Sequence, residues 1–273
     1  MSHILVVGGG PATAEEPVHL RARRSTAAPW RIVAPRVGGF PFTPFDALLT
    51  EVGLVDCVQR ETRDDTRAIF VDTFGEYGID AMRSAVDVPV IGAAEAALAV
   101  AAAHGPRFGI VTVWPASLQW LYERQLRRLA VADRCIGVRY VGAGHADADT
   151  PGITLDAMRS GSPAWLQRIV AAAESLADAG AHSVVFGCTC MAPLHAAVAT
   201  RCRIPVVCAA HAGANAVRDH VDGRRVTGTA AVHPPSASDE SRRRFAAWMD
   251  QRTMLPSDSG AGMDCPVCIT APD

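Results

Sequence analysis

A thiol stands where a strand of a parallel sheet is expected to end. In the sequence VVFGCTCM, residues 184–191, an apolar run leads through Gly187 to Cys188. A short apolar run bounded by glycine is typical of a strand buried in a parallel sheet, and ligands bind beyond the carboxyl ends of such strands. Cys188 is therefore a candidate nucleophile or acid/base. The alternative is a buried cysteine that only packs, since free cysteines often behave as small hydrophobic residues.

A thiol at that place is suited to moving a proton. Its ordinary pKa, about 8.5, falls when backbone amides or a helix N-terminus stabilise the thiolate. A helical pattern over residues 192–201 places a helix start soon after Cys188. Racemisation next to a carbonyl needs a base on one face of the carbon and an acid on the other. Cys188 is a candidate for one of these groups.

An approximate duplication points to a partner for this thiol. A strand in the first half leads to VDTFGEYGIDAMRSAVDVPVIG, and one in the second half leads to FGCTCMAPLHAAVATRCRIPVVC. Each copy reads as strand, loop, helix and a short strand introduced by Val-Pro or Ile-Pro, with Thr73 and Cys188 in matching places. Two similar lobes facing one another would bring the two loops to opposite walls of one cleft. Because an unassisted alcohol is a weak acid and base, we expect Thr73 to donate a hydrogen bond or position a water.

Residues around these two loops are candidate substrate contacts. Together with the glycine-rich turn after the first strand, the set comprises Gly9, Gly10, Phe74, Gly75, Thr112, Thr189 and Cys190. Thr112 either hydrogen-bonds a ligand carbonyl or caps a helix before Pro115. Cys190 either takes part as a second thiol or packs as a bystander. Of the histidines near these segments, His211 either faces the cleft or is structural, and His182 is expected at the far end of its strand.

Strand and helix patterns alternate along the chain, which predicts an α/β fold with parallel sheets and helices on both faces. We expect strands at residues 4–7, 30–34, 68–72, 108–113, 135–141, 183–186 and 205–208, besides the short strand introduced by Val-Pro in the first copy. Expected helices cover residues 79–84, 93–104, 115–130, 162–179, 192–201 and 240–251. The duplication divides the chain into a first lobe, residues 1–95 with about 206–240, and a second lobe, residues 96–205. Residues 253–273 are expected to form a flexible tail.

The composition favours a small molecule as partner. The 273 residues are 49% hydrophobic and 20% charged, with a formal net charge of −2. Nucleic-acid and membrane surfaces select a clearly basic face, so neither is expected as a partner. No signal peptide or membrane span is recognised, which predicts a cytoplasmic protein whose eight cysteines are mostly reduced.

Neither a metal nor a cofactor is expected. No cluster of His, Asp and Glu has metal-site spacing, and the lone Cys265-Pro-Val-Cys268 lacks the second pair that a zinc site needs. The opening VVGGGPAT suggests a dinucleotide-binding turn. However, Thr13 occupies the third glycine position, and the second strand ends without the acidic residue that holds a ribose.

Five segments in order carry a resemblance to a known family: TFGEYGIDAMRS, VPVIGAAEAAL, FGIVTV, AGAHSVVFGCTCM and IPVVCAAHAGANAV. Over residues 1 to about 220 the chain resembles the aspartate/glutamate racemase superfamily, and within it the hydantoin and allantoin racemase branch. The resemblance implies two pseudo-symmetric, flavodoxin-like α/β lobes with the active site in the cleft between them. It also implies cofactor-free catalysis and a homo-oligomer. Members of the branch usually carry one cysteine in each lobe, whereas this chain has Thr73 and Cys188.

The resulting hypothesis is a cofactor-independent racemase or epimerase that acts at an acidic carbon next to a carbonyl. Cys188 is the acid/base, Thr73 occupies the partner position, and the substrate is hydantoin-like or derived from an amino acid. Two alternatives stay open. One is a single-cysteine decarboxylase or lyase that resembles arylmalonate decarboxylase. The other is a relative that has lost catalysis and binds a small metabolite.

Overall fold

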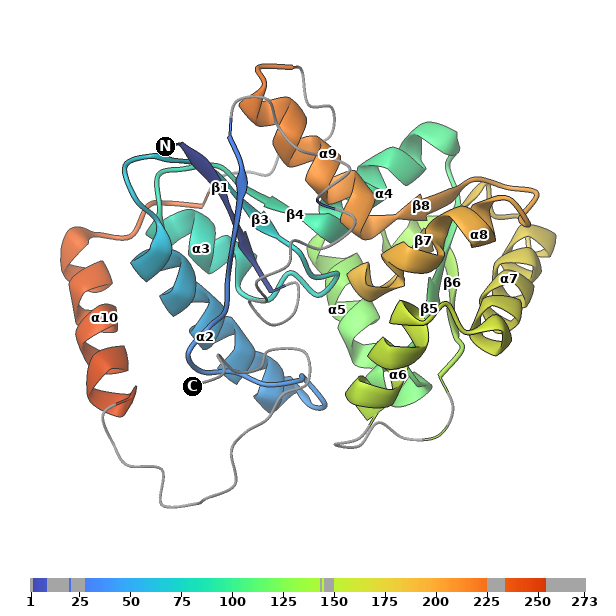
Figure 1. Ribbon diagram of the computed structural model, residues 1–273, viewed down its shortest axis with the longest axis horizontal. Coiled ribbons are helices and arrows are strands. Elements are labelled where there is room, and N and C mark those ends of the chain that lie inside the picture. Colours follow the sequence, from blue (N-terminus) through green and yellow to red (C-terminus); the bar gives the residue numbers. More distant parts are fainter. Residues whose placement is uncertain are drawn as a thin grey trace.

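Two parallel sheets form the framework of the chain (Figure 1). The computed structural model describes residues 2–8, 20, 28–142, 144, 150–224 and 234–253. Each sheet has four strands, in the orders β2-β1-β3-β4 and β6-β5-β7-β8. Both follow the same 2-1-3-4 pattern, which is that of flavodoxin-like sheets. The structure thus confirms the α/β class and the two related lobes predicted from the duplication.

The bounds of the elements follow the alternation read from the sequence. The strands are β1 His3–Val7, β2 Trp30–Val33, β3 Thr66–Val71, β4 Val90–Gly92, β5 Phe108–Thr112, β6 Cys135–Tyr140, β7 Ser183–Phe186 and β8 Val206–Cys208. The helices are α2 Pro44–Glu61, α3 Ile79–Ala85, α4 Ala93–His104, α5 Gln119–Arg128, α6 Thr150–Arg159, α7 Pro163–Asp178, α8 His195–Ala199, α9 Ala209–Val221 and α10 Asp239–Thr253. Three 3₁₀ turns are η1 Ala116–Leu118, η2 Ala132–Arg134 and η3 Thr189–Leu194.

The register of the strands brings the two candidate loops to equivalent sheet edges. Val7 at the end of β1 pairs with Val71 at the end of β3. In the second sheet, Val111 of β5 pairs with Phe186 of β7. Parallel strands end at the same edge of their sheet, so the loops that carry Thr73 and Cys188 leave from matching edges.

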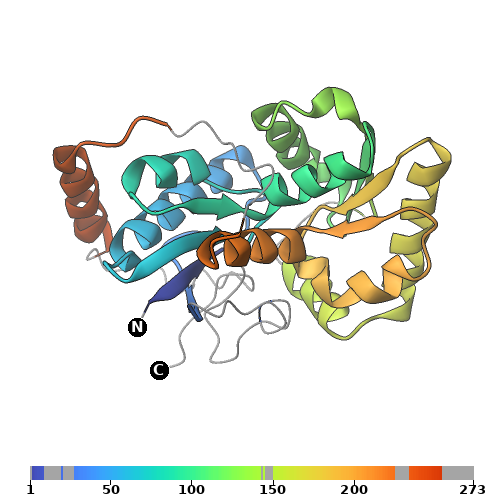
Figure 2. The same cartoon turned by 90° about the horizontal axis from the view of Figure 1, so that it is seen from above.

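Two helices join the lobes. α4 follows β4 of the first sheet but packs on β7 of the second, and α9 follows β8 of the second sheet but packs on β3 of the first. Figure 2 shows α4 and α9 side by side in the middle of the molecule. β8 pairs with β7 of the second sheet, and α9, which packs on β3 of the first sheet, begins at Ala209. The exchange of helices gives both lobes one continuous hydrophobic core.

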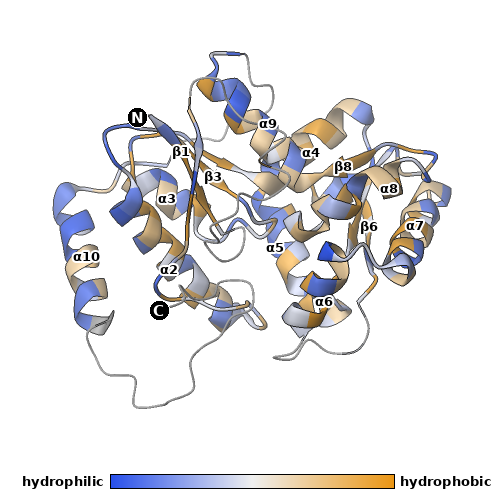
Figure 3. Cartoon of the chain, in the orientation of Figure 1, coloured by the Kyte–Doolittle hydropathy of each residue, from blue (hydrophilic) through white to orange (hydrophobic). Residues whose placement is uncertain are grey.

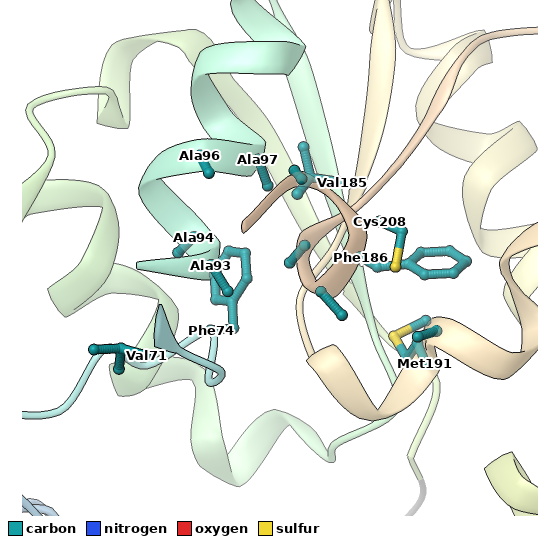
Figure 4. Packing of buried hydrophobic residues seen from close by; sticks show 14 of the residues in the cluster. Val71, Phe74, Ala93, Ala94, Ala96, Ala97, Val185, Phe186, Met191 and Cys208 are labelled. Carbon is teal, nitrogen blue, oxygen red and sulfur yellow. The ribbon is translucent and has the colours of Figure 1, made fainter. Parts of the chain in front are cut away.

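Alanine side chains allow this close packing at the junction. Ala93, Ala97 and Ala101 of α4 have no exposed surface. Figure 4 shows Ala93 and Ala94 next to Phe74 on one side of the junction, with Phe186, Met191 and Cys208 grouped on the other. Small residues let helices and sheets approach closely, so the loops next to the junction are held by a densely packed base.

Three helices, α2, α6 and α9, were not predicted. α2 begins with a capping box in which Thr43 and Asp46 exchange hydrogen bonds, and Pro44 takes the first helical position. These are strong helix-start signals. Leu54 and Val58 of α2 are buried against the first sheet. Leu54 also lies near Gly8, which follows β1.

The C-terminal helix α10, predicted at residues 240–251, lies against the outer side of α2 (Figure 1). Gln59 Nε2 of α2 donates to the Arg242 carbonyl at 2.8 Å, and the Arg242 guanidinium donates to the Ala85 carbonyl at 2.9 Å. Figure 3 shows α10 mostly in hydrophilic colours and the strands mostly in hydrophobic ones. Among the helices that the structure describes, none is both long and apolar enough to cross a membrane. The predicted tail with Cys265 and Cys268 lies outside the described residues, apart from Thr253.

Candidate active site

The loop that carries Cys188 is fixed by contacts beneath it. Tyr122 of α5 donates a hydrogen bond to the Gly187 carbonyl at 3.0 Å, and its ring leaves no room for a side chain at position 187. A Cβ there would lie 2.7 Å from Tyr122 Cε1 and 2.9 Å from Ile110 Cγ2. Glycine at 187 therefore allows the loop to lie directly on the buried Tyr122. This contact fixes the position of the loop that carries Cys188.

Cys188 itself is half-buried and stands at the N-cap of η3. The backbone N–H of Cys190 donates to Cys188 Sγ at 3.2 Å. A donor aimed at sulfur stabilises a thiolate over a thiol, which lowers the pKa of a cysteine. The local backbone thus provides one of the contacts expected for an acid/base thiol.

The structure corrects one expectation about this thiol. Cys188 forms a disulfide bond with Cys190, with Cα atoms 5.2 Å apart, so it is not the free thiol that the sequence predicts. The turn of η3 brings side chains two residues apart to the same side of the loop. Within the described part of the chain, Cys57, Cys135, Cys202 and Cys208 form no disulfide bond. The prediction of mostly reduced cysteines therefore holds for these four and fails at the proposed catalytic position.

Thr73 occupies a tight turn after β3. Its Oγ1 accepts a hydrogen bond from the Glu76 backbone N–H at 3.0 Å, and its methyl group lies on Gly8 at the end of β1. A Cβ on Gly8 would be 2.6 Å from Thr73 Cγ2, and Gly8 has a φ of +83°. The hydroxyl retains its proton for donation, because here it acts as an acceptor. Gly9 and Gly10, predicted as substrate contacts, lie outside the described residues.

The two loops meet across the lobes. Thr189 Oγ1 donates to the Asp72 carbonyl at 3.0 Å. Thr189 follows Cys188 and Asp72 precedes Thr73, so this bond joins the immediate neighbours of the two candidate catalytic residues. The sequence placed Thr73 and Cys188 in matching copies of one motif, and this contact brings the two copies together.

Thr112 and Phe74, both predicted as substrate contacts, are buried beside Tyr122. Thr112 has no exposed surface, and its hydroxyl is hydrogen-bonded to the hydroxyl of Tyr122 and to the Trp114 N–H. It therefore holds the tyrosine that supports the Cys188 loop. Phe74 is 6% exposed and its ring centroid lies 5.8 Å from that of Tyr122, so it packs the lobe junction. Gly75 is half-buried in the same turn, against Tyr77.

A buried carboxylate that the sequence analysis did not single out connects the Thr73 turn to the second lobe. Glu76 accepts hydrogen bonds from the Glu95 backbone N–H at 2.8 Å and from Gln125 Nε2 at 2.6 Å, and it pairs with Arg128. Burial, together with the nearby Glu95 carboxylate, raises the pKa of Glu76 to about 7 against the opposing effect of Arg128. Three contacts from α4 and α5 thus converge on one residue of the turn.

The backbone of Glu76 is strained as well. Its φ is +45°, which is uncommon for a residue with a side chain and costs on the order of 1 kcal/mol. The hydrogen bonds and the ion pair of its carboxylate hold the residue in this conformation. The conformation in turn aims the Glu76 N–H at the Thr73 hydroxyl.

A second set of contacts between the lobes is aromatic and ionic. Phe40 of the loop before α2 stacks on Trp114 after β5, with ring centroids 4.8 Å apart and planes inclined at 58°. Arg124 of α5 pairs with Glu51 of α2. Aromatic pairs of this geometry contribute about 0.5–1.5 kcal/mol beyond their buried area. The lobes are thereby held in one relative orientation near the two loops.

The histidines near the site make structural contacts. His195 Nε2 lies 2.9 Å from the Val206 carbonyl, and its ring stands edge-on to His211 at 4.8 Å. His182 Nδ1 contacts Arg107 at the start of its strand, at the far end from Cys188 as predicted. In the described part of the chain, no three His, Cys, Asp or Glu side chains are grouped so that they could hold a metal ion.

Comparison with known proteins identifies this arrangement of lobes and loops. Residues 20–217 match the Asp/Glu/Hydantoin racemase family. The chain belongs to this family. Membership confirms the resemblance inferred from the five sequence segments and includes both candidate loops.

Individual relatives lie in the hydantoin and allantoin branch. A hydantoin racemase from Paenarthrobacter aurescens is 27% identical over 165 residues, which cover 60% of this chain and 65% of that protein, slightly less than two thirds of its length. The allantoin racemase structure from Pseudomonas fluorescens has a TM-score of 0.68 at 23% identity and covers 87% of this chain and 98% of its own. The one from Klebsiella pneumoniae has a TM-score of 0.64 at 22% identity, covering 87% and 95%. These two structures show a shared fold.

Proposed function

We propose that this family member is a cofactor-independent racemase that acts at an acidic carbon between or beside carbonyl groups in a hydantoin-like ring. Reduced Cys188 exchanges the proton on one face of that carbon, and Thr73 serves the other face. The observation that carries the proposal is the hydrogen bond from Thr189 to the Asp72 carbonyl, because it joins the loop of the thiol to the loop of the hydroxyl.

The thiol suits the proton transfer. The pKa of a thiol is close enough to neutral pH for the thiolate to remove an activated proton and for the thiol to return it. The Cys190 N–H aimed at Cys188 Sγ supports the ionised form. The contacts between Tyr122 and Gly187 hold the loop in place, which keeps the sulfur in a fixed position relative to a bound substrate.

The hydroxyl of Thr73 acts with help from its surroundings. Its Oγ1 accepts from the Glu76 N–H, which polarises the O–H toward donation. An O–H donor of this kind either hydrogen-bonds the substrate or orients a water that carries the second proton. Exchange is then faster on the Cys188 face than on the Thr73 face, and the catalyst is asymmetric.

The substrate class is supported by chemistry and by the relatives. The carbanion formed in a hydantoin ring delocalises onto the carbonyls that flank the carbon, so weakly basic groups suffice to form it. The names of the relatives, hydantoin racemase and allantoin racemase, point to ring ureides of this type.

The test is proton exchange in deuterium oxide. Purified protein, reduced with a small thiol, is mixed with each enantiomer of a 5-substituted hydantoin and of allantoin, and exchange and optical rotation are followed by NMR and polarimetry. The proposal predicts deuterium at the stereocentre together with loss of rotation. Gas release and a deuterated product from an arylmalonate would instead identify a decarboxylase, and ligand binding without exchange would identify a non-catalytic relative.

A further inference from the structure

The pair Cys188–Cys190 differs from the other described cysteines in its surroundings. Cys188 and Cys190 are half-buried residues of one loop, their sulfurs are bonded to each other, and the Cys190 N–H donates to Cys188 Sγ. Cys57, in contrast, is completely buried, and burial raises its pKa to about 12. Burial also raises the pKa of Cys135 and Cys202. Thiolates are the species that attack and form disulfides, so the loop pair is the place where thiol chemistry is favoured.

The bond between the two sulfurs conflicts with the proposed reaction. A disulfide sulfur carries no proton to give and has no thiolate charge with which to take one. With Cys188 bonded to Cys190, the second lobe therefore offers no acid/base group. The protein is active only after the bond is opened.

We propose that Cys188 and Cys190 form a reversible dithiol–disulfide site, opened by low-molecular-weight thiols and closed by low-molecular-weight disulfides, and that its redox state switches the activity of Cys188. This inference rests on the proposed function. Cys190 is then the resolving partner of Cys188, a role that neither of its sequence-based interpretations included.

The exchange balances in two steps. A thiolate RS⁻ attacks the Cys190 sulfur, forms a mixed disulfide there and releases the Cys188 thiolate. A second RS⁻ attacks the sulfur of the R group, releases the Cys190 thiolate and leaves as RSSR. Two small thiols are oxidised and one protein disulfide is reduced. Closure is the reverse, with RSSR as the oxidant.

The fold supports this exchange. η3 holds the two residues in adjacent positions whether or not the bond is present, because its own backbone bonds include Met191 N–H to the Cys188 carbonyl. The Thr189 side chain between them is tied to Asp72. The dithiol form is thus positioned for closure, while partial exposure of both cysteines gives a small thiol access.

The experiment separates the site from the activity. Full-length protein is equilibrated in mixtures of reduced and oxidised glutathione, alkylated, digested and mapped by mass spectrometry, and the same samples are assayed for hydantoin exchange. We expect alkylation of Cys188 and Cys190 to increase together as the ratio of reduced to oxidised glutathione rises. Activity is expected to fall about tenfold or more in the oxidised samples. The Cys190→Ser variant cannot form the bond between residues 188 and 190, so in oxidised samples Cys188 is expected to carry a mixed disulfide with glutathione, which the mass map distinguishes from the protein disulfide.

Cys265→Ser/Cys268→Ser is the matched control, since it removes the other closely spaced pair in the sequence. It should respond to the ratio like the wild type. The proposal is overturned if the extent of alkylation of Cys188 and Cys190 does not change with the glutathione ratio, or if reduced and oxidised protein are equally active. Lack of exchange in every reduced sample would reject the proposed function, while the alkylation map would still decide whether the dithiol–disulfide site exists.

Discussion

The loops after β3 and β7 occupy the same place in two related sheets, yet they differ in chemistry. The loop after β3 carries Thr73, whose hydroxyl accepts a hydrogen bond from the Glu76 N–H, and Glu76, whose buried carboxylate contacts α4 and α5. The loop after β7 carries two cysteines and rests on Tyr122. Duplication of the fold has preserved where the loops lie, while their side chains have diverged. The first loop is held by a buried carboxylate with partners on two helices, whereas the second carries the two cysteines on which the proposed chemistry depends.

The largest expected effect comes from removing the thiol. Cys188→Ala removes the proposed acid/base group, so proton exchange should fall by roughly 10³-fold with either enantiomer of the hydantoin. The measurement is exchange in deuterium oxide with reduced protein. Cys202→Ala is the control, since Cys202 is also half-buried but lies in the loop after α8. Comparable losses in both variants would mean that Cys188 has no special role.

Substitutions at Thr73 sharpen the comparison of the loops. Thr73→Val keeps the shape but removes the hydroxyl, and exchange is expected to fall by about 10²-fold. Thr73→Cys makes the first loop like the second, and the difference between the rates for the two enantiomers should shrink. Initial rates for each enantiomer provide the readout. If Thr73→Val exchanges both enantiomers at the wild-type rate, Thr73 does not serve the second face.

The buried carboxylate of the first loop predicts a pH dependence of stability. Burial raises the pKa of Glu76 from its usual 4.5 to about 7 in the folded protein. Between these values the folded state binds more protons than the unfolded state, so this group's contribution to stability is complete below about pH 4.5. That contribution is lost as the pH rises through 7.

Glu76→Gln fixes the side chain in a neutral form and removes this dependence. The wild-type Tm minus that of the variant should decrease by several degrees between pH 5 and pH 8, measured by thermal unfolding. A difference that stays constant or increases over this range would show that the carboxylate is ionised throughout.

The support under the second loop is expected to have the smallest effect. Tyr122→Phe retains the ring that packs against Phe74 and loses the hydrogen bond to the Gly187 carbonyl. The free energy of unfolding should fall by about 1–2 kcal/mol, measured in urea. Thr112→Val, which removes the other hydroxyl of the same contact, should give a similar loss. Because both act through one hydrogen-bonded unit, the double variant should lose less than the sum.

The sequence predicted the framework better than the contacts within it. Apolar runs ending in glycine located the strands, and the duplication correctly predicted two related lobes. α2 was missed although Thr43, Pro44 and Asp46 carry its start signals, because Gly53 and the mixed pattern that follows obscure the helical period. The roles of Tyr122 and Glu76 depend on packing between lobes, which residue spacing along one chain does not contain. The two-residue spacing of Cys188 and Cys190 permits a disulfide bond, but spacing alone does not show that the two side chains lie on the same side of the loop.

The most direct test of the central claim is a crystal structure of the reduced protein with a hydantoin bound. The account predicts that the stereocentre lies between the loops, with Cys188 Sγ about 3.5 Å from the carbon on one face and Thr73 Oγ1, or a water bonded to it, on the other. A ligand bound away from this junction, or one approached by both side chains on the same face, would contradict it.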